Sequence, residues 1–375
     1  MKSQLLPEGF RDSLPELAAK EFTINSMFLD TMKKNGYLLV RPPLIEFESS
    51  LFFLTNESEN VNSFRLLDPI SQKMMGIRSD ITLQIARISC GSLNKNPRPL
   101  RLCYSGDVFK VKNNSLNLSR QITQIGTEII GIEENLCEKE LINLIIEILS
   151  KLKIKNFFIS FTMPTLINAI AKDFNLSNKD LEFVKDRFRN KNVTGISEIS
   201  KKLEKISEQL LFSVGNVDEN ITSLRQSKFP KNTKKEIENF ISIVLKLKKD
   251  FANLDILVDP LEIDESEYHT GIVFKVFSEN FKELFSGGNY KVSNENCIGF
   301  SGFIENLVKE SDIKVNQEKK VFVPIDVSTK LNAQIKKKGF IIIRAIKKLS
   351  QKQLKAFALA HRCDYYIEGN KILKL

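Results

Sequence analysis

Tryptophan is absent from this 375-residue sequence, and histidine occurs only twice, at His269 and His361. Cysteine is scarce and odd in number, and no two cysteines form a CxxC pair. The five are Cys90, Cys103, Cys137, Cys297 and Cys363. Their spacing argues against a disulfide framework and against a zinc site, so we predict free thiols that pack as small apolar side chains, and no metal.

Long apolar runs are also missing. No stretch of about 18 apolar residues occurs, so no membrane-spanning helix is expected. The segment from Met1 to Glu8 lacks the apolar core of a secretion signal. We therefore expect a cytoplasmic protein without a membrane partner, and its length predicts two domains around a large core.

Acidic residues are in deficit, with 46 Asp and Glu against 56 Lys and Arg, which gives a formal net charge of +10. A basic surface can bind nucleic acid. The lysines are nevertheless scattered over polar helix faces, and no motif interleaves aromatic with basic residues. The pattern favours a lysine-rich composition over a nucleic-acid partner.

The order of sequence patterns predicts an α+β fold. Residues 15–35 have a helical period that ends at Gly36, and residues 37–45 read as a strand that Pro42-Pro43 confines to a sheet edge. Such an edge strand is a common place for a subunit contact. Two long β segments follow at 100–111 and 122–132.

The second half of the chain contains two further regions. Residues 164–253 are rich in Lys, Glu, Leu and Ser with helical periodicity, which predicts a helical insertion. Residues 321–375 alternate strand and helix patterns, which predicts a small α/β unit. We therefore predict a first domain at 1–318, with the insertion at about 164–253, and a small C-terminal α/β domain at 319–375.

The most informative stretch runs from Glu267 to Phe274. An aromatic pair, Tyr268-His269, precedes Thr-Gly and a β-branched run, and Tyr290 follows Gly287-Gly288. This pattern predicts a β-hairpin with a Gly-Gly turn, whose polar aromatic side chains face a pocket.

Six motifs in a fixed order carry a family resemblance. They are Leu6-Pro7-Glu8-Gly9-Phe10-Arg11-Asp12, Arg41-Pro42-Pro43, Met75-Gly76-Ile77-Arg78-Ser79-Asp80-Ile81-Thr82, Tyr104-Ser105-Gly106-Asp107-Val108-Phe109-Lys110, Arg120-Gln121-Ile122-Thr123-Gln124-Ile125-Gly126-Thr127-Glu128, and the hairpin just described. With them, residues 5 to 310 resemble the class II aminoacyl-tRNA synthetase core of histidyl-tRNA synthetases, and the resemblance implies an antiparallel sheet flanked by helices. The chain is more similar still to that family's non-catalytic relatives, the regulatory subunits of ATP phosphoribosyltransferase.

The resemblance implies a histidine pocket. The positions that match the family's pocket are Asp80, Thr82, Gln124, Glu128, Tyr268, His269 and Tyr290. An acid suits the ammonium group of free histidine, and an acid with a hydroxyl suits its imidazole. Buried charges are costly unless a ligand or an internal partner pairs with them. The alternative is therefore that Asp80 and Glu128 form internal hydrogen bonds in a vestigial core.

The resemblance also implies that catalysis has been lost. The family holds ATP with arginines, whose planar fork binds phosphate oxygens. Here Lys110 and Asn306 replace two of these arginines, Asp264 replaces the third, and Lys112 replaces a nucleotide-binding glutamate. Each such group can contribute several kcal/mol of barrier lowering. We therefore expect no catalytic residue and no cofactor.

The function implied by the resemblance is regulation of the first step of histidine biosynthesis. The chain would activate the short-form catalytic subunit of ATP phosphoribosyltransferase and take part in feedback inhibition by histidine. A hetero-octamer is expected, with dimers of this chain formed through the class II core. Two alternatives stay open, an active or diverged histidyl-tRNA synthetase and an RNA-binding module of synthetase-like fold.

Overall fold

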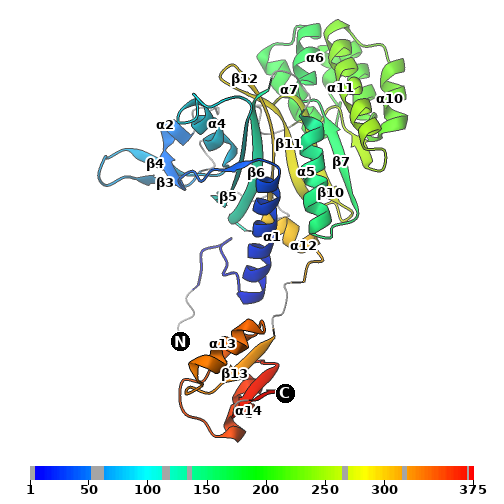
Figure 1. Ribbon diagram of the computed structural model, residues 1–375. Coiled ribbons are helices and arrows are strands. Elements are labelled where there is room, and N and C mark those ends of the chain that lie inside the picture. The colour runs from blue at the N-terminus through cyan, green and yellow to red at the C-terminus, as the bar shows by residue number, and fades with distance from the viewer. Residues whose placement is uncertain are drawn as a thin grey trace. The chain divides into compact units, whose positions relative to one another are not determined.

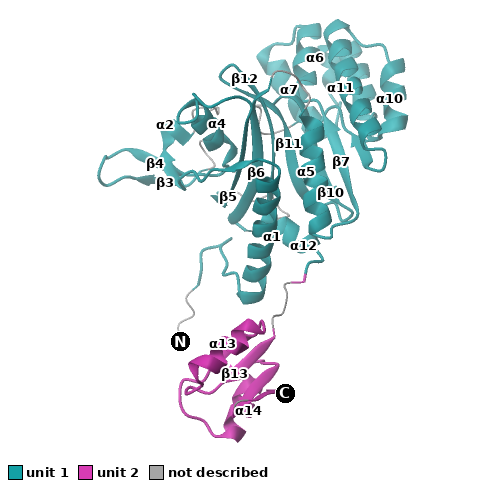
Figure 2. Ribbon diagram, in the orientation of Figure 1, with its two compact units in different colours: residues 1–313 teal, residues 314–375 magenta. Residues whose placement is uncertain are grey.

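The computed structural model describes residues 5–51, 63–111, 119–132, 137–263, 269–314, 319–369 and 371–375. The chain divides into two compact units, Met1–Ile313 and Lys314–Leu375 (Figure 2). The predicted boundary at residue 318 lies outside the described residues and stays a prediction. No helix among the described ranges is long and apolar enough to cross a membrane.

A nine-stranded sheet forms the centre of the first unit (Figure 1). Two neighbouring pairs, β1 with β5 and β7 with β9, are parallel, and the remaining pairs are antiparallel. In spatial order the strands are β1 (Leu38–Leu39), β5 (Leu100–Phe109), β6 (Gln121–Ile132), β12 (Glu295–Phe303), β11 (Glu283–Val292), β10 (His269–Ser278), β7 (Phe157–Thr162), β9 (Asp255–Val258) and β8 (Gly215–Asn216).

The two faces of this sheet differ because side chains alternate along each strand. On β6, Ile125 and Ile129 join the main hydrophobic core, and Ile122 and Ile130 belong to a second core on the opposite face. The main core lies under three helices, α1 (Pro15–Lys34), α5 (Glu138–Lys151) and α12 (Ile304–Glu310). The second core lies under α4 (Thr82–Cys90).

Polar contacts fix the helices of the main core. The Lys20 ammonium group on α1 donates to the carbonyl oxygens of Val308 and Ser311, each over 2.8 Å. These carbonyls lie at the end of α12, where the helix leaves them without internal partners. The contact therefore ties α1 to the helix that follows β12.

Six helices lie between β7 and β9. Ser177, Ser200 and Asn216 begin three of them, and each side chain accepts a hydrogen bond from a backbone N–H of the first turn. The helices are α6 (Leu166–Phe174), α7 (Asn178–Arg189), α8 (Ile196–Ile199), α9 (Lys201–Leu211), α10 (Val217–Gln226) and α11 (Lys231–Asp250). Their buried residues belong to the main core, so this segment and the sheet form one hydrophobic interior.

A second, three-stranded sheet projects from the first unit (Figure 1). Its strands are β2 (Ile45–Phe47), β4 (Met74–Ile77) and β3 (Arg65–Leu67), and α2 (Glu48–Leu51) follows β2. The prediction of one strand over residues 37–45 was wrong. Pro42 lacks a backbone N–H for a ladder, and the chain runs without strand structure between β1 and β2.

The C-terminal unit is an α/β layer structure. Its four-stranded sheet has the order β14-β13-β15-β16, with an apolar cluster on each face. The elements are β13 (Lys320–Val323), α13 (Thr329–Lys337), β14 (Ile341–Arg344), α14 (Gln351–Ala360), β15 (Tyr365–Glu368) and β16 (Lys371–Lys374). Together with the sheet and insertion of the first unit, it confirms the predicted fold class.

The Gly-Gly pair of the hairpin was wrongly predicted to be a turn. Gly287 and Gly288 lie in the middle of β11, and the chain reverses instead between Ser278 and Glu283. A Cβ atom on Gly287 would lie 2.2 Å from a backbone oxygen of β12, and one on Gly288 would lie 2.7 Å from a backbone oxygen of β10. Glycine is therefore required for close packing within the strands.

Replacement of the buried Ile145 by alanine should lower the free energy of unfolding by about 2–5 kcal/mol, because α5 would lose packing against the sheet. The matched control is Ile70→Ala, at a position 92% exposed, which should change stability by less than about 0.5 kcal/mol. Urea unfolding followed by circular dichroism measures both. Similar losses for the two variants would contradict the described core.

Candidate functional site

The predicted pocket residues converge on one face of the nine-stranded sheet. The strand register places Leu102 on β5, Glu128 on β6, Gly299 on β12 and Gly288 on β11 in one row across the sheet. Directly opposed residues point to the same face. The two glycines therefore leave space beside Glu128, and a Cβ atom on Gly299 would lie only 1.8 Å from its Oε2.

Three hydroxyl groups surround the buried Glu128 side chain. The Tyr290 hydroxyl donates to Oε2 over 2.8 Å, and the Tyr104 hydroxyl donates to Oε1 over 3.2 Å. Thr82 Oγ1 lies 3.0 Å from the Tyr104 hydroxyl. Either hydroxyl can be the donor in this contact.

The network continues from Thr82 to the second predicted acid. Asp80 Oδ1 accepts from the backbone N–H of Thr82 over 3.0 Å and from the side-chain amide of Gln124 over 2.7 Å. The Gln124 carbonyl oxygen accepts from the backbone N–H of Ile81 over 2.8 Å. Five of the seven predicted residues thus belong to one hydrogen-bonded network at the start of α4.

The remaining two predicted pocket residues lie on β10 or just before it. His269 is paired with Tyr290 in the register of β10 and β11, and it lines the same cavity as Glu128. Tyr268 falls within residues 264–268, outside the described part of the chain.

The electrostatics of this site disfavour a charge on Glu128. Burial raises the pKa of Glu128 to about 8, with a smaller rise from the negative charge of Asp80, while the hydroxyls of Tyr290, Tyr104 and Thr82 oppose the change. The protonated form therefore predominates at pH 7. Burial beside this acid also raises the pKa of Tyr290.

The cavity that the described residues enclose is small, at about 20 Å³. Its lining residues are Thr82, Glu128, His269, Ser286, Gly287, Gly288, Tyr290, Gly299, Phe300 and Ser301. A water molecule needs about 10–15 Å³, whereas a cavity that takes up benzene measures about 150 Å³. In this conformation the site holds about one water and not an imidazole ring.

Tyr104 is a site residue that the sequence-based prediction missed. It lies opposite Gly126 on β6, and a Cβ atom on Gly126 would be 2.3 Å from the Tyr104 hydroxyl. The missing side chain at Gly126 lets the phenol ring cross β6 toward Glu128. The spacing of Gln124, Gly126 and Glu128 on one strand face was the available signal, because it leaves a gap between two polar residues.

Lys110 and Asn306, two of the positions predicted to lack an ATP-binding arginine, are held by local contacts. The Lys110 ammonium group lies over the Phe303 ring, 4.6 Å from its centroid. The Asn306 amide donates to the carbonyl oxygen of Glu283 over 2.9 Å. Burial raises the pKa of Glu283, against the opposing charges of Lys275 and Lys110. Lys112 and Asp264 lie outside the described residues.

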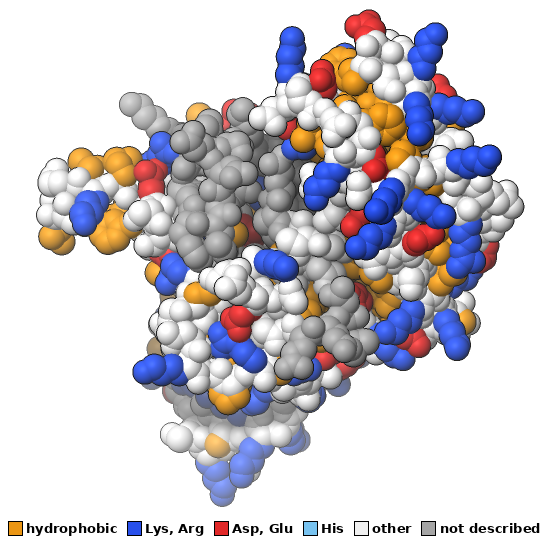
Figure 3. Space-filling model, turned by 90° about the horizontal axis from the view of Figure 1, so that it is seen from above, with side chains coloured by type: hydrophobic (Ala, Val, Ile, Leu, Met, Phe, Trp, Pro, Cys, Tyr) orange, Lys and Arg blue, Asp and Glu red, His pale blue; other side chains and the backbone are white. Residues whose placement is uncertain are grey.

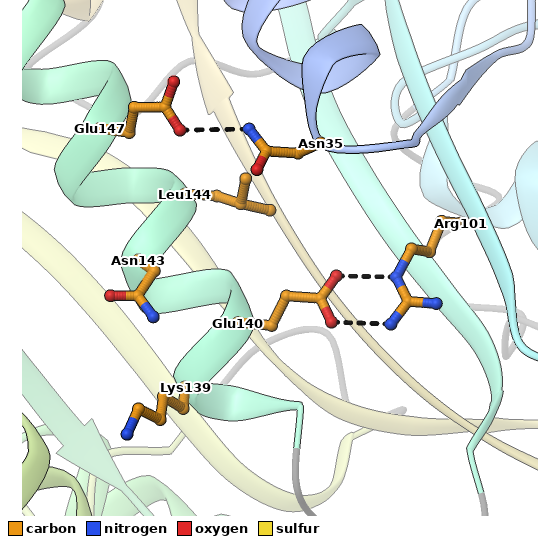
Figure 4. A pocket seen from close by; sticks show the side chains of 7 residues that line it. All are labelled: Asn35, Arg101, Lys139, Glu140, Asn143, Leu144 and Glu147. Carbon is orange, nitrogen blue, oxygen red and sulfur yellow. Dashed lines mark hydrogen bonds and ion pairs between the residues drawn. The ribbon is translucent and has the colours of Figure 1, made fainter.

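A second cavity, of about 600 Å³, lies between the end of α1, β5 and α5 (Figure 4). Arg101 binds Glu140 through two hydrogen bonds of 2.8 Å, and this contact lowers the pKa of Glu140. Asn35 donates to Glu147 over 3.1 Å. Four of the polar lining residues are thus paired with one another within the cavity. Across the described chain, no group of three His, Cys, Asp or Glu residues could hold a metal ion.

Comparison with known families and proteins extends these observations. The family model for histidyl-tRNA synthetase matches residues 9–307. An ATP phosphoribosyltransferase regulatory subunit of Rhodospirillum centenum is 32% identical over 308 residues, which cover 81% of this chain and 80% of the relative. One of Gluconobacter oxydans is 30% identical over 343 residues, which cover 91% of this chain and 90% of the relative.

Solved structures share the fold. An ATP phosphoribosyltransferase regulatory subunit/histidyl-tRNA synthetase from Bacillus halodurans has a TM-score of 0.79 at 20% identity, over 95% of this chain and 96% of the other. A histidyl-tRNA synthetase from Nostoc sp. PCC 7120 has a TM-score of 0.74 at 17% identity, over 98% of this chain and 91% of the other. These likenesses confirm the predicted class II fold.

The raised pKa of Glu128 predicts a stability that depends on pH. Between the ordinary pKa of 4.5 and the folded pKa of about 8, the folded state binds a proton that the unfolded state lacks. The free energy of unfolding should therefore fall by up to about 1.4 kcal/mol per pH unit through this window, and the contribution should be lost above it.

Urea unfolding from pH 5 to 9 measures this effect. The Glu128→Gln variant, which cannot ionise, should show a flatter profile than the wild type. Glu140→Gln is the control and should keep the wild-type slope in this range, because the pKa of Glu140 is lowered from 4.5 and its contribution changes only at more acidic pH. Parallel wild-type and Glu128→Gln profiles would contradict a protonated Glu128.

Proposed function

This chain belongs to the histidyl-tRNA synthetase family and, within it, to the regulatory subunits of ATP phosphoribosyltransferase, and we propose that it activates the short-form catalytic subunit of that enzyme. The observation that carries the proposal is the similarity to the Gluconobacter oxydans regulatory subunit over 343 residues. That length exceeds the 313 residues of the first unit, so the similarity extends into the second.

The proposal includes the loss of amino-acid activation. Asn306 is short, and its amide is engaged by the first residue of β11. Lys110 carries a point charge where the family has a planar, bidentate guanidinium group, and its ammonium group lies against an aromatic ring. These contacts support a non-catalytic role.

Histidine is the proposed effector of the pocket around Glu128. The network supplies the acids, hydroxyls and amide that a free amino acid with an imidazole side chain would use. The cavity of about 20 Å³ must expand to admit it, so histidine would select an arrangement in which Glu128 exchanges its tyrosine hydroxyls for the ligand. A ligand that binds one arrangement better can shift activity, with a typical coupling of about 1–3 kcal/mol.

Self-association of this chain is proposed to occur around β1 and the projecting three-stranded sheet. Strand β1 is at one end of the nine described strands, and its Leu38 and Leu39 are 64% and 51% exposed. Phe47, Leu67 and Met74 add exposed apolar surface on the projecting sheet. Hydrophobic side chains are visible on this projection at the left of Figure 3. Apolar side chains gathered beside a free strand edge are typical of a protein interface. A hetero-octamer would combine such dimers with catalytic subunits.

Reconstitution with the short catalytic subunit tests the regulatory function. We expect faster product formation when this chain is added, inhibition by histidine, and no histidine-dependent ATP–pyrophosphate exchange by this chain alone. The Glu128→Gln variant should keep the activation but require roughly tenfold or more histidine for the same inhibition, because glutamine cannot take up the negative charge that a bound imidazolium would favour on Glu128, and a hydrogen bond to a charged group is worth about 1.5–3 kcal/mol. The exposed Glu198→Gln substitution is the control.

The outcomes separate the two parts of this proposal. Absence of activation would overturn the regulatory function. Activation with the same histidine response in wild type and Glu128→Gln would overturn only the pocket assignment.

The Leu39→Asp and Phe47→Asp double variant should convert a dimer to a monomer, because it places two charges on the proposed contact surface. Light scattering after size-exclusion chromatography measures the mass. The matched control is Phe212→Asp, at a position that is 83% exposed and lies on the helical insertion. If the double variant is still a dimer, self-association does not use the surface around β1 and the projecting sheet.

A further inference from the structure

An exposed aromatic residue occupies a strained position at the tip of the hairpin that joins β10 to β11. Phe281 has a φ angle of +57°, in the left-handed region that residues other than glycine and asparagine rarely adopt, and it is 77% exposed. It is the third residue of the loop 279–281, and its backbone N–H donates to the Ser278 carbonyl oxygen over 2.9 Å. Such a loop usually has glycine at its left-handed third position. Phenylalanine here is unfavourable for the backbone and places an apolar ring in water.

Contacts from two sides hold this tip in place. The Asn280 amide donates to the carboxylate of Glu310, the last residue of α12, over 3.0 Å. The Asn156 amide, just before β7, donates to the Glu279 carboxylate over 2.7 Å, and the backbone N–H of Glu279 donates to the Asn156 carbonyl oxygen over 3.2 Å. The Phe281 ring is therefore positioned before any partner binds, which lowers the entropic cost of an association that uses it.

Phe281 belongs to a patch of three aromatic rings. Phe158 on β7 and Phe277 on β10 are directly opposed in the strand register, so both point to the same face of the sheet. Their rings stack with centroids 5.3 Å apart, and the Phe281 ring meets Phe158 edge-on at 5.6 Å. Phe158 and Phe277 are half-buried, and among the described residues neither belongs to the main or the second core. These three rings form the aromatic patch, an apolar surface that neither core takes up.

Basic side chains border the aromatic patch. Lys282 follows the tip, Lys155 comes just before β7, and Lys309 lies on α12. Burial lowers the pKa of Lys309, and the positive charges of Lys282 and Arg11 lower it further. The two acids at the tip already accept hydrogen bonds from amides. The patch therefore fits a protein surface with an apolar pocket bordered by carboxylates, which would relieve the repulsion among the basic groups.

The aromatic patch is separate from the surface proposed for self-association. Five strand spacings of about 4.8 Å lie between β1 and β10 in the nine-stranded sheet. A complex of two kinds of subunit needs one surface on this chain for its own copies and another for the second kind. Because a dimer formed through β1 does not require the aromatic patch, the second kind of subunit is the occupant that this geometry favours.

We propose that the aromatic patch is the contact surface for the catalytic subunit of ATP phosphoribosyltransferase, with the Phe281 ring as its central anchor and Lys155, Lys282 and Lys309 at its rim. The inference rests on the proposed regulatory function and adds to it the surface on which the partner binds. A few residues dominate the affinity of most interfaces, and large aromatic side chains are prominent among them. The rim lysines contribute to the rate of association and to its dependence on salt.

Titration of the catalytic subunit with this chain tests the proposal. Phe281→Gly should raise the concentration needed for half-maximal activation by at least roughly tenfold, because the anchor is lost. The same substitution should keep or raise the melting temperature, because glycine adopts the left-handed backbone without strain. Phe281→Tyr keeps the ring and should activate like the wild type. A lower melting temperature of Phe281→Gly would assign the ring to folding and overturn the proposal.

Matched variants control for the loss of a ring and of charge. Phe212→Gly removes an aromatic side chain from a position that is 83% exposed on the helical insertion, and it should leave the titration unchanged. Lys155→Gln combined with Lys282→Gln should slow association with the catalytic subunit and weaken its dependence on salt, as measured by biolayer interferometry. Lys201→Gln combined with Lys202→Gln, both exposed on α9, should leave the association rate unchanged.

The outcomes separate this surface from the regulatory function. If the wild type neither binds nor activates the catalytic subunit, both proposals fail. If the wild type activates and Phe281→Gly requires the same concentration, only the surface assignment fails. If Phe281→Gly converts a dimer to a monomer in light scattering, the aromatic patch binds a second copy of this chain and not the catalytic subunit.

Discussion

The arrangement of the central sheet depends on the burial of one carboxyl group. Glu128 lies under the sheet face with both oxygens hydrogen-bonded to tyrosine hydroxyls, and an unpaired acid there would be costly. Its space exists because Gly288 and Gly299 carry no side chains in the same row. The glycines, the hydroxyls and the acid therefore depend on one another, and substitution of any one changes the environment of the rest.

The opposite face of the same strands has a different physical role. It carries a continuous apolar core that also includes the helices between β7 and β9. Alternation along β6 keeps Ile125 and Ile129 apart from Gln124 and Glu128, one residue away in each case. The sheet thus separates the main core from the polar network by a single residue step, so side chains of the network can change while the main core persists.

Sequence patterns predicted the elements more reliably than their junctions. Helical periodicity identified the insertion and α1, because long apolar periods are strong signals. The Gly287-Gly288 pair was wrongly assigned to a turn, because glycine also permits close approach between strands and its local sequence does not distinguish the two uses. Tyr104 was missed for a related reason. Its role depends on standing opposite Gly126, and that register is a long-range property.

The parallel pairing of β7 and β9 has a topological consequence. Parallel neighbours cannot be joined by a tight turn. The chain must therefore pass from the end of β7 back to the level of its start before β9 can begin. The helices from Leu166 to Asp250 are that return path. They cannot be cut back to a short loop while β9 keeps its place. These helices look like a module added to the surface, but the connectivity of the sheet requires them as the link between β7 and β9.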